Sequence, residues 1–108
     1  MLRARLLGAF DVIGVPAPEL GSRKARTLLK VLLVARGERV PFDRLCDVLW
    51  GDQPPANPME QLQVLVSRLR TVLGRDRVER VDGGYRIVYD WLDVDDLDTA
   101  EKLVRQLA

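Results

Sequence analysis

The side chains best suited to chemistry lie on one face of a predicted helix, residues 58–73. Apolar residues recur there at helical spacing and predict a buried stripe: Leu62, Leu65, Val66, Leu69 and Leu73. At about 100° per residue, a mainly polar set falls opposite this stripe: Glu60, Gln61, Gln63, Val64, Ser67, Arg68, Arg70 and Thr71. Arginine pairs with guanine, glutamine with adenine, and an exposed valine can contact a thymine methyl group. We therefore predict that this face reads base edges in DNA; a plain solvated surface is the alternative.

The residue types that most enzymes need are absent or predicted to be unreactive. The chain has no histidine and a single cysteine, which removes the commonest general base and leaves no zinc site. Cys46 shares the helical spacing of Phe42, Leu45 and Leu49, so we interpret it as a small core residue rather than a reactive thiol. The sequence predicts neither an enzyme nor a metal or cofactor site.

The net charge of +1 conceals an uneven distribution. Residues 1–90 carry 15 Lys and Arg against 11 Asp and Glu, whereas residues 91–108 carry 2 against 5. Positive charge gathers in residues 22–30, which include no acid, and in residues 67–80, which hold five arginines against Asp76 and Glu79. A locally basic face can bind a polyanion because the ligand responds to the nearby field. Ordinary solvated charge is the alternative interpretation.

Length and composition favour one globular domain. The chain has 108 residues, of which 47% are hydrophobic and 31% charged. No apolar run approaches the roughly 20 residues of a membrane helix, and the run before Asp11 is too short for the core of a signal peptide. We therefore expect a cytoplasmic protein without a membrane partner.

The first half of the chain predicts strands and then two helices. Short β-rich runs before Pro16 predict a small antiparallel sheet. Ser22 is a suitable cap for a central helix that Gly37 ends. A second helix is predicted over about Phe42–Leu49, and a stiff loop with three prolines follows over residues 52–58.

The second half adds the polar-faced helix and a hairpin. Asn57 can cap that helix, and β-rich runs on either side of Gly83 and Gly84 predict the hairpin. Acidic residues after Trp91 indicate another short helix, so the predicted division is 1–92 for one domain and 93–108 for the start of a helical one. Sheet, helices and hairpin in this order predict an α+β winged helix-turn-helix.

Four runs carry a resemblance to a known family: Leu20–Arg26, Asp43–Gly51, Leu62–Arg70 and Gly84–Ile87. Together they resemble the OmpR-type winged-helix domain, and most closely its variant in the SARP regulators of bacterial antibiotic gene clusters. The resemblance covers about residues 1–90. It implies an N-terminal DNA-binding module of a transcriptional activator, followed by a bacterial transcriptional activation domain.

The resemblance also implies roles for individual residues. Val64, Ser67 and Arg68 match positions that face the DNA groove, and Arg70 matches a phosphate contact. Trp50 matches a position against the DNA backbone, although its role as a helix-end anchor is an equal alternative. The loop from Asp52 through Gln53 to Asn57 matches the segment that faces the sigma subunit of RNA polymerase. The family pattern leaves a dimer on DNA open.

One departure weakens this assignment. The tip of the wing often carries a basic residue, but Asp82 stands there and should repel phosphate. Contact by the wing then depends on Arg80 or Arg86. The leading interpretation is sequence-specific binding of double-stranded DNA and recruitment of RNA polymerase. The alternative is a winged helix that binds other proteins and has lost DNA binding.

Overall fold

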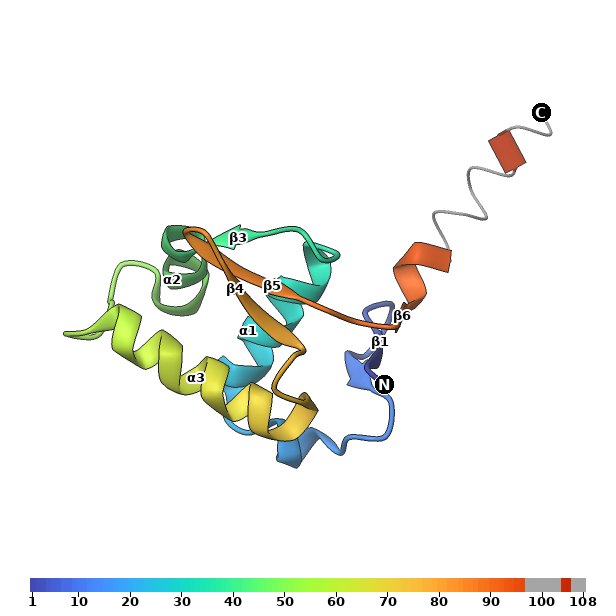
Figure 1. Cartoon of the computed structure of the whole chain (residues 1–108), viewed down its shortest axis with the longest axis horizontal. Helices are drawn as coiled ribbons and strands as arrows, with labels where there is room; N and C mark the ends of the chain where they lie inside the picture. The colour runs from blue at the N-terminus through green and yellow to red at the C-terminus, as the bar shows by residue number, and fades with distance from the viewer. Residues whose placement is uncertain (97–103, 106–108) are drawn as a thin grey trace.

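The computed structural model of the chain describes residues 1–96 and 104–105 (Figure 1). Its elements follow in this order: β1 (Arg3–Arg5), β2 (Asp11–Val12), the 3-10 helix η1 (Ala17–Leu20), α1 (Arg23–Val34), β3 (Val40–Pro41), α2 (Phe42–Trp50), α3 (Pro58–Leu73), β4 (Val78–Val81), β5 (Gly84–Ile87) and β6 (Trp91–Leu92). Figure 1 shows α1 in the middle of the fold, with α2, α3 and the β4–β5 hairpin around it. This is the predicted α+β winged helix-turn-helix.

Helix α1 is the central element of the hydrophobic core. Its residues Leu28, Leu29, Leu32 and Leu33 are completely buried. Burial of each leucine contributes about 1.5–3 kcal/mol. Ser22 caps the helix as predicted, because its hydroxyl oxygen accepts a 3.2 Å hydrogen bond from the Ala25 N–H.

Helix α3 packs on α1 with the predicted face. Leu62, Leu65, Val66 and Leu69 are buried, and Val64 is 42% exposed. Asn57 occupies the N-cap position, but its side chain makes no capping hydrogen bond, and Pro58 begins the helix. The predicted faces of α3 are therefore confirmed, while Asn57 caps by position alone.

The predicted hairpin is formed by β4 and β5, which pair from Val78 opposite Ile87 to Val81 opposite Gly84. Strand β3 pairs with β5 on the edge away from β4, so the three strands form a sheet in the order β3-β5-β4. A Cβ atom on Gly84 would lie 2.2 Å from the Val40 carbonyl oxygen. Glycine at this position therefore allows β3 to approach the hairpin.

The N-terminal sheet differs in part from its prediction. Strands β1 and β2 are antiparallel as expected, but β6 joins β1 in parallel, with Arg3 opposite Trp91. The 3-10 helix η1, which the sequence pattern did not predict, follows β2 over Ala17–Leu20. A parallel pair needs a long crossover connection, here most of the domain, so a local sequence pattern gives no sign of it.

Two aspartates after the hairpin hold the N-terminus in this sheet. The Leu2 N–H donates to Asp90 Oδ2 at 2.6 Å, and the N–H groups of Leu6 and Leu7 donate to Asp93 at 2.9 and 3.0 Å. The bond from Leu2 is the main cause of a lowered pKa of Asp90. Partial burial opposes ionisation of Asp93, but backbone N–H groups outweigh it and lower its pKa as well.

The segment predicted to begin a second domain is only partly described. Residues 93–96 are helical and connect to the N-terminal sheet through Asp93. Residues 97–103 and 106–108 lie outside the described residues, so the division at residue 92 remains a prediction.

We expect Leu69→Ala to lower the free energy of unfolding by about 2–5 kcal/mol, because truncation leaves a cavity between α3 and α1. Val64→Ala should change it by less than about 0.5 kcal/mol, since the Val64 side chain is largely in water. Urea unfolding followed by circular dichroism measures both. Equal losses would mean that the faces of α3 are assigned wrongly.

We expect the free energy of unfolding to fall as the pH drops below about 4. The pKa values of Asp90 and Asp93 are lowered in the folded chain, so the unfolded chain binds more protons in that range. Their contribution is complete above the unfolded pKa and is lost as pH falls through the folded pKa. Asp93→Asn should flatten the acid limb of stability against pH; an unchanged limb would contradict the role of Asp93.

Candidate nucleic-acid interface

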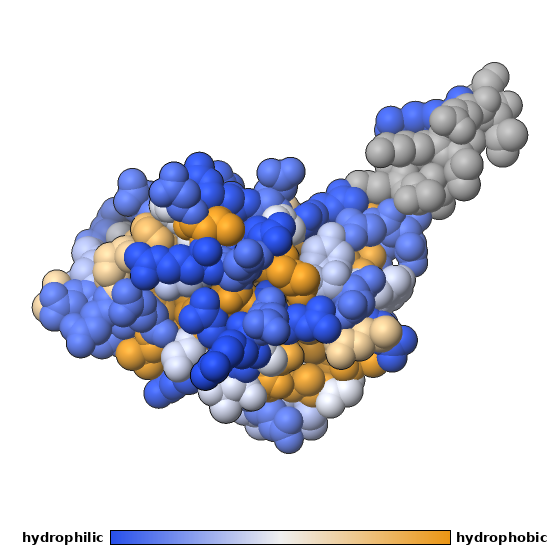
Figure 2. Space-filling view, in the orientation of Figure 1, coloured by the Kyte–Doolittle hydropathy of each residue, from blue (hydrophilic) through white to orange (hydrophobic). Residues whose placement is uncertain are grey.

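The outward face of α3 presents the predicted set of polar side chains. The residues of the predicted set that the structure leaves exposed are Glu60, Gln61, Gln63, Val64, Ser67, Arg68 and Thr71. Arg70 is half-buried at the edge of this face. On the face seen in Figure 2, hydrophilic residues cover most of the hairpin and α3, with smaller apolar areas between them. The predicted α3 residues are thus brought together on one helix.

A groove separates the second half of α3 from strand β4. Its volume is about 850 Å³, and it is lined by Ser67, Arg70, Thr71, Arg75, Asp76, Val78, Glu79 and Arg80. Three guanidinium groups therefore face a polar channel beside the exposed helix face. An arrangement of this kind suits a phosphate backbone, which attracts arginine through charge and paired hydrogen bonds.

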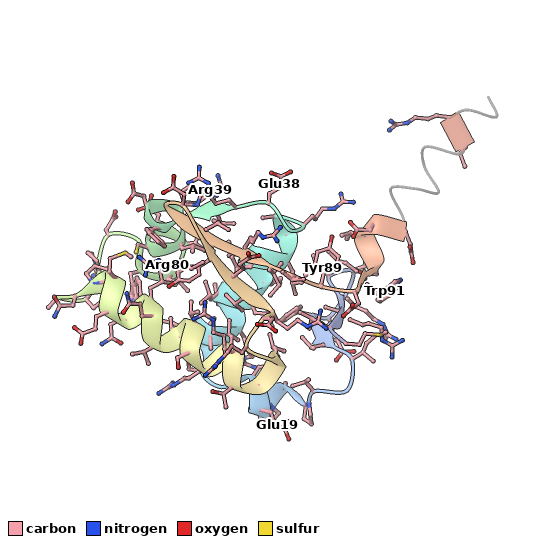
Figure 3. All side chains as sticks on the ribbon, viewed as in Figure 1. Glu19, Glu38, Arg39, Arg80, Tyr89 and Trp91 are labelled. Atoms are coloured by element: carbon pink, nitrogen blue, oxygen red, sulfur yellow. The ribbon has the colours of Figure 1, made fainter. Side chains whose placement is uncertain are left out.

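Contacts within the protein orient two of these arginines. Arg70 Nε donates to the Val78 carbonyl oxygen at 3.0 Å, which links α3 to the hairpin. The guanidinium carbon of Arg80 lies 5.5 Å from the centre of the Phe42 ring, and that ring meets Tyr85 edge-on at 5.5 Å. Arg80 thus lies between the hairpin and α3 (Figure 3). Both side chains are held before any ligand arrives, which lowers the entropy cost of binding.

A second groove lies along the first half of α3. It measures about 310 Å³ and is lined by Ser22, Lys24, Trp50, Pro55, Gln61, Val64, Leu65 and Arg68. Lys24 Nζ lies 5.8 Å from the centre of the Trp50 ring and donates to the Leu49 carbonyl oxygen at 2.5 Å. Trp50 also packs against the core. Both predicted roles of Trp50, anchor of a helix end and surface contact, are compatible with this position.

Not every basic residue after Gly74 is available to a ligand. Among the five arginines of the basic segment 67–80, Arg77 is half-buried and forms a 2.9 Å ion pair with Asp90. Arg86 forms a 2.6 Å ion pair with Glu79, its partner across the hairpin. Successive strand residues alternate in direction, so Arg86 lies on the opposite side of the hairpin from Arg80. Of the two arginines considered for the wing, the structure turns Arg80 toward α3.

A basic residue from outside the hairpin lies beside the tip of the wing, and the sequence pattern did not predict it. Arg39, just before β3, donates from Nη1 to the Asp82 carbonyl oxygen at 2.9 Å (Figure 3). Its guanidinium group is exposed and lies beside the acidic tip residue. The two residues are 43 positions apart, and only the β3–β5 pairing that a sequence pattern does not reveal brings them together.

Comparison with known proteins identifies the family and the fold. Residues 18–87 match the family described as "Transcriptional regulatory protein, C terminal". The chain belongs to this family. This match includes α3, both grooves and the hairpin.

The proteins whose sequences match this chain are transcriptional regulators of the SARP type. The chain is 37% identical to the regulatory protein AfsR of Streptomyces griseus over 67 residues, which are 62% of the chain and 7% of AfsR. It is 33% identical to the regulatory protein DnrI of Streptomyces peucetius over 98 residues, 81% of the chain and 34% of DnrI. It therefore spans only a small part of these curated relatives.

A solved structure with the same fold is that of Mycobacterium tuberculosis EmbR in complex with a low-affinity phosphopeptide. The TM-score is 0.72 at 31% identity, over 82% of this chain and 25% of the EmbR chain. Sequence and fold agree that the chain is a DNA-binding domain of the kind found in transcriptional regulators.

The structure also places the remaining predicted residues. Asp52, Gln53 and Asn57 are exposed in the loop between α2 and α3, where the Gln53 N–H donates to the Trp50 carbonyl oxygen at 3.1 Å. Cys46 is half-buried against the core, and burial, with help from Asp43 and Asp47, raises its thiol pKa. Its thiolate form is thus disfavoured at neutral pH.

Neither a metal cluster nor a membrane span is found in the part of the chain that the structure describes. Residues 1–96 and 104–105 contain no group of metal-ligating side chains. They also contain no helix long and apolar enough to cross a membrane.

Proposed function

We propose that this domain binds a specific sequence of double-stranded DNA with α3 in the major groove. The observation that carries the proposal is the exposed polar face of α3 between two grooves lined by basic side chains. A helix of this kind fits the major groove, and the cations on both sides meet the phosphate backbones that border it.

The base-reading residues in this proposal are Gln61, Gln63, Val64, Ser67 and Arg68. Arg68 offers the paired donors that recognise guanine, the glutamines suit adenine, and Val64 suits a thymine methyl group. Thr71 adds a different contact. Its hydroxyl already donates to the Ser67 carbonyl oxygen at 3.0 Å, so it offers DNA its methyl group and oxygen lone pairs.

Phosphate contacts in this proposal come from both sides of α3. Arg70, Arg75 and Arg80, in the groove beside the hairpin, would contact the phosphates of one DNA strand. Trp50 and Lys24, in the groove on the other side of α3, would contact the phosphates of the other DNA strand. Arg39 gives the wing tip the cation that Asp82 does not supply. Contacts of this kind fix the register of the protein on DNA without reading sequence.

We further propose that the domain is the N-terminal module of an activator that recruits RNA polymerase. The exposed loop containing Asp52, Gln53 and Asn57 would contact the sigma subunit, and residues 93–108 would begin a helical activation domain. The exposure of this loop and its prolines support a stiff contact surface. A regulator of this kind acts in the cytoplasm, where bacterial DNA lies.

Mobility shifts with a site selected from random DNA and with a scrambled duplex test the reading of bases. Arg68→Ala should weaken the selected site by about 1–3 kcal/mol and leave the scrambled duplex nearly unchanged. Arg75→Ala should weaken both equally and reduce the slope of log affinity against log salt by about one unit, since it removes a phosphate contact. Absence of any binding to either duplex would favour a protein-binding winged helix instead. Equal weakening of both duplexes by Arg68→Ala would overturn its role in base reading.

Combined substitution of Asp52 and Gln53 by alanine tests the polymerase contact. We expect DNA affinity within about twofold of the parent chain, because the altered side chains lie outside both α3 grooves. Transcription from the selected site, reconstituted with the full-length regulator and purified RNA polymerase, should fall. Unchanged transcription would remove the loop from the mechanism while leaving DNA binding intact.

A further inference from the structure

The outer face of α1 carries two adjoining grooves that are separate from the two grooves beside α3. One, of about 550 Å³, lies between the second half of α1, β3 and α2. The other, of about 290 Å³, lies between the first half of α1 and the segment from Phe10 to Leu20. Thr27 and Lys30 line both grooves, so the two form one surface. We call it the α1 surface.

One end of the α1 surface is apolar. Its lining there includes Val31, Val34, Pro41 and Val48. Val34 is 60% exposed and Val48 47% exposed, on different helices that border the same groove. Valines exposed together around a concavity are a feature of binding sites, whereas scattered exposed valines need no explanation.

The α1 surface is also basic. Its lining contains five basic side chains and no acidic one: Arg23, Arg26, Lys30, Arg39 and Arg44. Arg23, Arg26, Lys30 and Arg44 form no ion pair with any acidic side chain within residues 1–96 and 104–105. Cations three and four residues apart on one helix repel each other by a few tenths of a kcal/mol per pair. An acidic partner would relieve this repulsion.

Apolar and basic side chains occur together on the α1 surface, and this combination favours a protein partner over nucleic acid. Phosphate gains nothing from Val34 and Val48, whereas an amphipathic helix covers them with its apolar stripe and places carboxylates beside Lys30 and Arg26. Helix α1 is 12 residues long, or about 18 Å at 1.5 Å per residue, which matches about three turns of such a partner.

We propose that the α1 surface binds an acidic amphipathic helix of a partner protein. Its lining comes from the segment before α1, from α1, from Arg39 with β3, and from α2. The proposed DNA contacts lie on α3, the hairpin, the end of α2 and Lys24 at the start of α1, with Arg39 at the wing tip. Apart from Arg39 the two surfaces share no residue, so the domain is able to hold DNA and this helix at the same time. The inference does not depend on the loop between α2 and α3.

A fluorescent peptide tests the proposal on the whole 108-residue chain. The probe is a helical peptide of about 14 residues, with leucines spaced three and four residues apart and glutamates elsewhere. A scrambled peptide of the same composition is its control. Fluorescence anisotropy measures binding of each peptide, and mobility shifts measure binding of mixed-sequence DNA by the same variants.

Two charge reversals form the matched pair. Lys30→Glu should weaken the patterned peptide about tenfold and DNA less than about twofold, whereas Arg75→Glu should do the reverse. Val34→Ser should also weaken the peptide, with the same unfolding midpoint as the parent chain. This double dissociation separates the proposal from the DNA function, since either activity can fail while the other is measured.

Four outcomes would overturn the proposal. The scrambled peptide could bind as well as the patterned one, or Arg75→Glu could weaken the peptide as much as Lys30→Glu does; the peptide would then act only as a polyanion. Weakening of DNA binding by Lys30→Glu to the same degree as by Arg75→Glu would assign the surface to nucleic acid. Self-association in sedimentation that Val34→Ser abolishes would assign it to a second copy of the chain.

Discussion

Burial of one side of α1 is the constraint on which the rest of this domain depends. The leucines that α1 places in the core pack against α2, α3 and β5, and each contributes about 1.5–3 kcal/mol of apolar burial. The net stability of a small domain is only about 5–15 kcal/mol, so losing even one of these buried leucines would remove a large fraction of it. Because α3 must bury its own apolar stripe against α1, its polar face has to point outward. The candidate DNA-reading surface is therefore a consequence of how the core is packed.

The structure separates the basic residues into those that hold the fold and those that are left for ligands. Arg77 binds Asp90, Arg86 binds Glu79, and Arg36 binds Asp95 at 2.6 Å. Arg68, Arg75 and the cations of α1 are exposed, and no carboxylate pairs with them within the described residues. A net charge close to zero is thus compatible with a basic interface, because cations without a carboxylate partner in the described part of the chain are gathered on α1 and beside α3. Counting charges along the chain overstates the cations available near Gly74, where Arg77 is paired with Asp90.

Aspartates after the hairpin connect the two ends of the domain. Asp90 and Asp93 accept hydrogen bonds from the first residues of the chain, and the Tyr89 hydroxyl donates to Asp95 at 2.6 Å. Burial, together with this hydrogen bond, raises the pKa of Tyr89 to about 12, so the hydroxyl stays protonated as a donor. The acidic composition that suggested the start of another domain has a structural purpose here. It holds the first helical turn after β6 close to the N-terminal sheet.

The sequence by itself determined the three main helices, the β4–β5 hairpin and which face of α3 is buried. Helical spacing is a local property, so the buried stripe of α3, the exposed Val64 and the cap at Ser22 followed from nearby residues. Tertiary structure alone decided which distant residues meet. The parallel pairing of β1 with β6, the ion pair of Arg77 with Asp90 and the position of Arg39 at the wing tip join residues far apart in the chain. Such contacts depend on the register and packing of whole elements, which a local pattern does not encode.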